Sequence, residues 1–173
     1  MIERLRKSAA DPADEMEALY ARLVDDEYFA ACENGASADF DPARAVFVSG
    51  YLRLGEVERA WEVHQEITEP LAVFESLNSF VRAHELPAQE AADRGALLAI
   101  DEDNRVVAAQ LWERLAYFSE WHLPPEVSAR FKIQAGNAWR PILKDRLALQ
   151  KSVNEVFPHH GLADRVRSAL HLS

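Results

Sequence analysis

Proline and glycine residues divide this chain into short segments, and between them apolar residues recur at helical spacing. Asp11-Pro12 and Asp41-Pro42 are typical of helix starts, because Asp caps a first turn and Pro suits the first helical position. Asn34-Gly35 and Gly55 are typical of helix ends. From these signals we expect helices over residues 12–33, 43–54 and 56–68, with a loop over 36–40.

The rest of the chain continues this alternation, with one ambiguous region. An apolar run over 96–100, a turn-like Asp101-Glu102-Asp103-Asn104 and a second apolar run over 105–109 fit a β-hairpin. The apolar positions from Val107 onward also keep helical spacing, which favours a helix from 104 to 121. Further helices are expected over 71–86, 126–134, 141–157 and 162–170, with 88–94 either a short helix or a loop and Gly136-Asn137 as a break.

The predicted fold class is therefore all-α. We expect a compact array of about seven or eight helices with antiparallel helical hairpins, and a short β-hairpin near 96–109 is the alternative. At 173 residues, one domain over 1–173 is the default. The single cysteine excludes an internal disulfide, and no apolar run is long enough for a membrane span or a secretory signal. These features predict a cytoplasmic protein that does not enter membranes.

Charge is unevenly spread along the chain. Residues 130–173 hold eight bases and three acids, a net +5, whereas residues 1–129 hold 11 bases and 26 acids, a net −15. The two parts therefore form an acidic body and a basic C-terminal region. Either they attract each other within the fold, or the basic region binds an anionic partner. Nucleic acid is ranked last as a partner, because the acidic body repels it at long range.

Residues 45–70, AVFVSGYLRLGEVERAWEVHQEITEP, resemble one tetratricopeptide or pentatricopeptide helix hairpin. Tyr51, Gly55 and Ala60 fall at that family's spacing of an aromatic residue, a turn glycine and a small residue. The resemblance implies that two helices pack closely and that the hairpin takes part in partner binding. Its pattern does not recur at the family's period of about 34 residues.

Motifs that carry catalysis or bind cofactors fail at required positions. Gly50 and Gly55 have P-loop spacing, but Glu56 and Val57 stand where Lys and Ser or Thr are needed. No zinc-protease motif, nucleophile elbow or complete calcium loop is present. We therefore expect no catalytic residue, no cofactor and no metal ligand.

The leading hypothesis is a non-catalytic protein–protein interaction module, acting as an adaptor, chaperone or regulatory protein. Its partner would be another protein, and a homo-oligomer is also open. The candidate contact residues combine the hairpin, an aromatic residue beside a base, and the basic C-terminal region. They are Tyr51, His64, Trp139, Arg140, Lys144 and Lys151.

The alternative hypothesis is a small helical enzyme, or a sensor of a ligand or metal. It requires a cleft in which acids, bases and aromatic residues from separate helices meet. Its candidate pocket residues are His64, Tyr117, Glu120 and His122. The two hypotheses differ in whether these four side chains converge.

Overall fold

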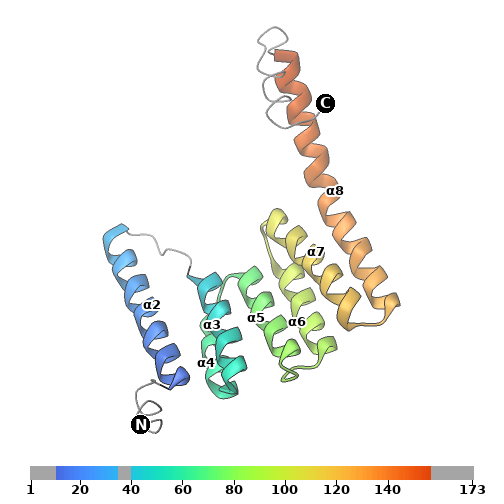
Figure 1. Cartoon of the computed structure of the whole chain (residues 1–173). Helices are drawn as coiled ribbons and strands as arrows, with labels where there is room; N and C mark the ends of the chain where they lie inside the picture. Colours follow the sequence, from blue (N-terminus) through green and yellow to red (C-terminus); the bar gives the residue numbers. More distant parts are fainter. Residues whose placement is uncertain (1–10, 35–39, 157–173) are drawn as a thin grey trace, which may run out of the picture.

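The computed structural model describes residues 11–34 and 40–156, and these residues form seven α-helices and no strand. The helices lie side by side in chain order, from α2 at one end to α8 at the other (Figure 1). The all-α prediction is thus confirmed over this part of the chain. The helices are α2 (Pro12–Asn34), α3 (Asp41–Leu54), α4 (Val57–Gln65), α5 (Pro70–Arg82), α6 (Ala88–Asp101), α7 (Arg105–His122) and α8 (Pro125–Val156).

Consecutive helices pack as hairpins, α3 with α4, α5 with α6 and α7 with α8. The turn between α3 and α4 contains Gly55, whose φ of 83° is left-handed and favours glycine. The first helices of the three hairpins also pack against each other, α3 on α5 and α5 on α7. They form one layer of the array, and that layer carries the candidate site.

The core runs through these helices as one cluster of buried apolar side chains. Leu77 and Phe80 of α5 and Leu111 and Leu115 of α7 are almost fully buried. Trp61 of α4 stacks on Phe80, with ring centroids 3.8 Å apart. Burying each such side chain stabilises the fold by roughly 1.5–3 kcal/mol, so the middle of the array is its most firmly packed part.

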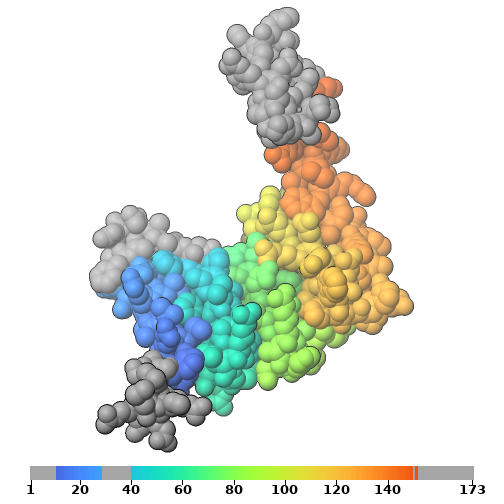
Figure 2. Space-filling model, viewed as in Figure 1, coloured from blue at the N-terminus to red at the C-terminus, as the bar shows by residue number. Residues whose placement is uncertain are grey.

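The two end helices, α2 and α8, lie at opposite sides of the molecule (Figure 2). α2 packs on α3, and the first half of the 32-residue helix α8 packs on α7. The second half of α8 extends beyond the other helices (Figure 1). No helix in the part of the chain that the structure describes is both long and apolar enough to span a bilayer.

The β-hairpin alternative near 96–109 is wrong. Residues 96–101 finish α6, and residues 105–109 begin α7. The Asn104 side chain caps α7, accepting hydrogen bonds from the backbone N–H groups of Val106 (3.0 Å) and Val107 (3.4 Å). This cap favours the helix over a returning strand, because it satisfies donors that the first helical turn leaves open.

The break predicted at Gly136-Asn137 is also wrong, because α8 runs without interruption through Gly136 and Pro141. An internal Gly costs a helix about 1 kcal/mol and an internal Pro about 3 kcal/mol relative to Ala. Packing on α7 offsets part of this cost, since Ser128 and Ala135 of α8 are buried. The helix predicted over 162–170 lies outside the described residues.

Asp11 and Asp41 were both predicted to begin helices, but their side chains act differently in the structure. Asp11 caps α2 as predicted, accepting a hydrogen bond from the Ala13 N–H at 3.1 Å. Asp41 instead becomes the first residue of α3, and its carboxylate accepts hydrogen bonds from the backbone N–H groups of Thr68 (2.7 Å) and Glu69 (2.6 Å). These N–H groups bond to Asp41 instead of to carbonyls of α4. The helix α4 accordingly ends at Gln65 rather than at residue 68.

Candidate functional site

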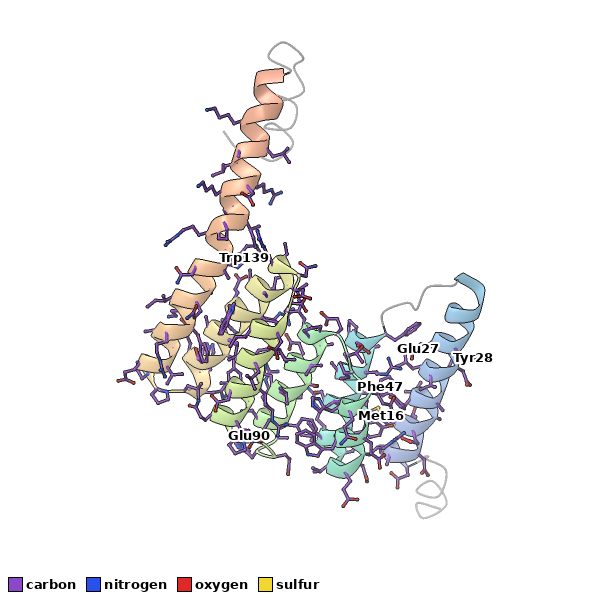
Figure 3. The ribbon with its side chains drawn as sticks, turned by 180° about the vertical axis from the view of Figure 1, so that it is seen from behind. Met16, Glu27, Tyr28, Phe47, Glu90 and Trp139 are labelled. Carbon is purple, nitrogen blue, oxygen red and sulfur yellow. The ribbon has the colours of Figure 1, made fainter. Side chains whose placement is uncertain are left out.

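An open groove with a volume of about 860 Å³ lies over α3, between α2 and α5. Its wall is mostly apolar, and Val46 of α3 and Leu19 of α2 are 70% and 52% exposed at its edge. Figure 3 shows Met16 and Phe47, two of its lining residues, between α2 and α3. The other apolar lining residues are Pro42, Ala45, Gly50, Leu71 and Ala72.

A second hollow of about 730 Å³ lies between α5 and α7. Phe74 and Phe118 line it, and Tyr117 and Trp121 stand at its edge with 65% and 72% exposure. The Tyr117 and Trp121 rings contact each other edge to face at 6.4 Å. This hollow is more polar than the first, since Asn78, Arg82, Gln110, Glu113 and His122 also line it.

The two hollows meet at Glu75 and Arg114, which line both. These side chains form an exposed ion pair between α5 and α7. Together the hollows make one furrow across the first helices of the three hairpins, here called the α3–α5–α7 groove. It is apolar at the α2 end and aromatic and polar at the α7 end.

Small residues set the close helix spacing on which the groove depends. A Cβ at Gly50 would lie 2.8 Å from the Met16 methyl carbon, so the flexible end of Met16 fills the space that glycine leaves between α2 and α3. A Cβ at Gly95 of α6 would lie 2.7 Å from the Phe74 ring and 3.0 Å from Leu115. Gly95 therefore holds α6 tightly against α5 and α7, which fixes Phe74 in the floor of the second hollow.

Charged side chains hold α2 in place as the outer wall. Arg44 of α3 is buried and pairs with Glu27 of α2 and with Asp41, the latter at 3.1 Å. Burial alone would raise the pKa of Asp41. The hydrogen bonds from Glu69 and Thr68 and the nearby Arg44 together outweigh burial, so the pKa of Asp41 lies below its ordinary value.

Two tyrosines extend this attachment along α2. The Tyr20 hydroxyl donates to Glu66 Oε2 at 2.5 Å, and burial followed by this bond raises the pKa of Tyr20 to about 12. The Tyr51 hydroxyl donates to Glu17, which also pairs with Arg59 at 2.6 Å. The hydrogen bond from Arg59, with that from Tyr51, lowers the pKa of Glu17. We call the contacts of Arg44, Tyr20 and Glu17 the α2 clamp.

Asn78 presents an unusual polar atom at the second hollow. Its Oδ1 is buried and has no hydrogen-bond partner among the described residues. A buried acceptor left unpaired costs roughly 1–3 kcal/mol.

Two of the predicted contact residues, Tyr51 and His64, do not lie on the groove. Tyr51 is 2% exposed and belongs to the core. His64 is half-buried between α4 and α5, with Nδ1 2.6 Å from Ser76 Oγ. Ser76 donates to the Val73 carbonyl, so His64 Nδ1–H donates to Ser76. Burial, together with the positive charge of Arg94, lowers the pKa of His64.

The other four predicted contact residues lie along α8. Trp139 is half-buried and donates from Nε1 to Glu113 of α7 at 3.2 Å, near the level at which α8 extends beyond α7 (Figure 3). Arg140 and Lys144 are exposed and line a shallow apolar hollow of about 570 Å³ with Leu143 and Leu147. Lys151, which lies just over one helical turn beyond Leu147, is also exposed.

The four residues of the alternative pocket do not converge. Tyr117 and His122 line the second hollow. Glu120 instead pairs with Lys132 of α8, and His64 contacts Ser76 on another part of the array. Among the side chains that the structure describes, no three His, Cys, Asp or Glu residues are grouped so as to hold a metal ion.

Sequence reasoning did not single out Val46, Asn78 or Arg114. Val46 belongs to the apolar run over residues 45–48, which is typical of a core segment, yet it is 70% exposed at the edge of the groove. Asn78 does interrupt the apolar pattern of its segment, and that interruption was the available signal.

Comparisons with known proteins add no relationship. No family model matches the chain, and neither the curated proteins nor the solved structures include a match.

Proposed function

We propose that this chain is a non-catalytic protein–protein interaction module that binds a segment of another protein in the α3–α5–α7 groove. The observation that carries the proposal is the groove itself, an open furrow across three hairpins with exposed Val46, Leu19, Tyr117 and Trp121. Aromatic and apolar side chains grouped on an open surface are typical of protein contact sites.

The polarity of the groove supports a peptide as the occupant. The α2 end offers apolar contacts, and the α7 end offers Asn78, Gln110 and Arg82 for hydrogen bonds with a peptide backbone or a side-chain carboxylate. A peptide main chain provides donors and acceptors at regular spacing for such contacts.

The tetratricopeptide-like hairpin is part of the same proposal. Gly55 has the left-handed conformation that the resemblance implies, and Tyr51 and Ala60 are both buried between helices. These features support a family-like hairpin in α3 and α4. The role of an adaptor, chaperone or regulatory protein follows from this reading, as does action in the cytoplasm.

A selection of displayed random peptides on the purified chain tests the proposal. Peptides that bind the native chain should lose affinity by about tenfold or more with Val46→Glu and with Trp121→Ala, since both alter the groove. The matched control is Ile100→Glu on α6, which is 67% exposed and lies outside the groove, and it should leave affinity unchanged.

An equal loss of peptide affinity with Ile100→Glu would contradict the proposal. So would selected peptides whose affinity is unchanged by both groove variants.

The alternative of a small helical enzyme or ligand sensor predicts a different result. Native mass spectrometry would then show a retained small molecule or metal ion, and His122→Ala would release it.

A further inference from the structure

The second half of α8 has an amphipathic face that no other described helix covers. Arg140, Leu143, Lys144 and Leu147 recur at three- and four-residue spacing, so they share one side of the helix. Leu143 and Leu147 are 52% and 67% exposed. Two large apolar side chains flanked by two bases form a surface suited to an acidic partner with apolar side chains of its own.

That description fits α2, the helix at the opposite end of the array. α2 contains seven acids and a single base, Arg22. Some of these acids serve the α2 clamp, but Glu15 and Asp26 are exposed and have no ion pair within the described part of the chain. With Leu19, they recur at intervals of four and seven residues, which places all three on one side of α2.

The exposed side chains on the two end helices therefore match in kind. On α8, Arg140 and Lys144 lie on either side of Leu143, and Leu147 follows one turn further on; on α2, Glu15 lies one turn before Leu19 and Asp26 two turns after it, and Val46 on α3 is exposed in the same groove. The two surfaces cannot meet within one molecule, because α2 and α8 lie at opposite ends of the array (Figure 2). They can meet between two molecules.

We infer that the second half of α8 docks on the α2 end of a second copy of this chain. Leu143 and Leu147 cover Leu19 and Val46 of the second copy, while Arg140 and Lys144 face its Glu15 and Asp26. The contact joins different surfaces, so it generates either a reciprocal pair with two such contacts or an open chain of copies. This inference goes beyond the proposed function, since it needs no other protein.

Analytical ultracentrifugation of the full chain at about 0.1 mM protein and low ionic strength tests self-association. We expect a concentration-dependent species larger than the monomer, which weakens as salt is raised because the contact contains exposed charges. Arg140→Glu with Lys144→Glu should raise the dissociation constant by about tenfold or more, and Glu15→Lys with Asp26→Lys should do the same.

The decisive experiment mixes the two double variants, Arg140→Glu with Lys144→Glu and Glu15→Lys with Asp26→Lys. One chain then carries acids on α8 and the other carries bases on α2, so the mixture should associate even though each variant alone does not. Arg105→Glu with Arg130→Glu is the matched control, since it changes the net charge equally at exposed bases outside the proposed contact. It should leave association unchanged.

A wild-type chain that stays monomeric under these conditions would overturn the inference, as would variants that associate like the wild type. Binding of the monomer to vesicles with anionic lipid, lost with Arg140→Glu and Lys144→Glu, would assign the same face to a membrane instead. The α8 contact shares Leu19 and Val46 with the α2 end of the groove, so a second copy and a peptide compete there. Failure of self-association still leaves the peptide selection valid, because the selection measures binding of a different ligand and also tests Trp121, which lies outside the α8 contact.

Discussion

The two end helices stay attached to the molecule by different means. α2 is held along its length by the buried Arg44, by Tyr20 and by Glu17, which link it to α3 and α4. Among the described helices, α8 packs on α7 through its first half, by apolar contacts and by exposed polar contacts such as Lys132 with Glu120 (Figure 1). A helix end that packs on no other described helix depends mainly on its own backbone hydrogen bonds, which makes α8 the easier of the two to perturb locally.

The largest effect is expected at the α2 clamp. Arg44→Met removes the buried cation between Glu27 and Asp41, and we expect the free energy of unfolding to fall by about 3 kcal/mol. Urea denaturation followed by circular dichroism measures the change. Lys132→Met at the α8 end is the control, and its exposed pair with Glu120 should be worth less than about 1 kcal/mol. Equal losses would show that α2 and α8 are held alike.

A pair of glycine substitutions should separate the packed middle from α8. Gly95→Ala forces a methyl group against the Phe74 ring, so we expect a loss of about 1–3 kcal/mol despite the better helix propensity of Ala. Gly136→Ala meets nothing within 4 Å and should instead stabilise the protein by about 0.5–1 kcal/mol. Thermal denaturation measures the change in stability of each variant. A loss of stability in both, or a gain in both, would contradict this view of the packing.

Pro141 provides a local test of α8. Pro141→Ala restores a backbone N–H that can donate to the carbonyl of Asn137. We expect slower amide hydrogen exchange in residues 142–149, by roughly tenfold, with the global free energy of unfolding changed by less than about 1 kcal/mol. A large global effect would mean that the second half of α8 unfolds together with the body rather than separately.

The smallest effect is expected from His64, which lies in the packed middle. Its lowered pKa means that the folded state prefers the neutral ring, whereas the unfolded chain takes up a proton near its ordinary pKa of about 6.5. Stability is therefore complete above about pH 6.5 and declines as the pH falls toward the folded-state pKa. His64→Gln should flatten this part of the stability profile, measured by urea denaturation between pH 5 and pH 8. An unchanged profile would show that another group titrates there.

Several parts of the fold were predictable because the signals that specify them are local. Asp11-Pro12 and Gly55 act on the backbone within one helical turn, and α2 begins and α3 ends where these residues predict. Two failures involve contacts distant in sequence. Asp41 bonds to Thr68 and Glu69 rather than acting as a cap, and α8 continues past Gly136 after packing on α7.

The candidate site was less predictable than the fold. Tyr117 and His122 were expected at a pocket, and both line the α3–α5–α7 groove. Tyr51 and His64 were predicted as contact residues, but both pack inside the array. The sequence could not distinguish the two cases, because an aromatic residue or a histidine gives the same pattern in a core as on a contact surface. Val46 lies in an apolar run that is typical of a core segment, and only the tertiary structure shows that it is exposed.

The sequence by itself determined that the chain is helical, where several of its helices begin and end, and that its charges separate into an acidic body and a basic C-terminal region. Those properties depend on backbone preferences within a few residues and on composition. Only the tertiary structure decided that α3, α5 and α7 share a groove and that α2 and α8 stand at opposite ends. The placement of distant helices depends on how their side chains interlock, and no local pattern encodes that arrangement.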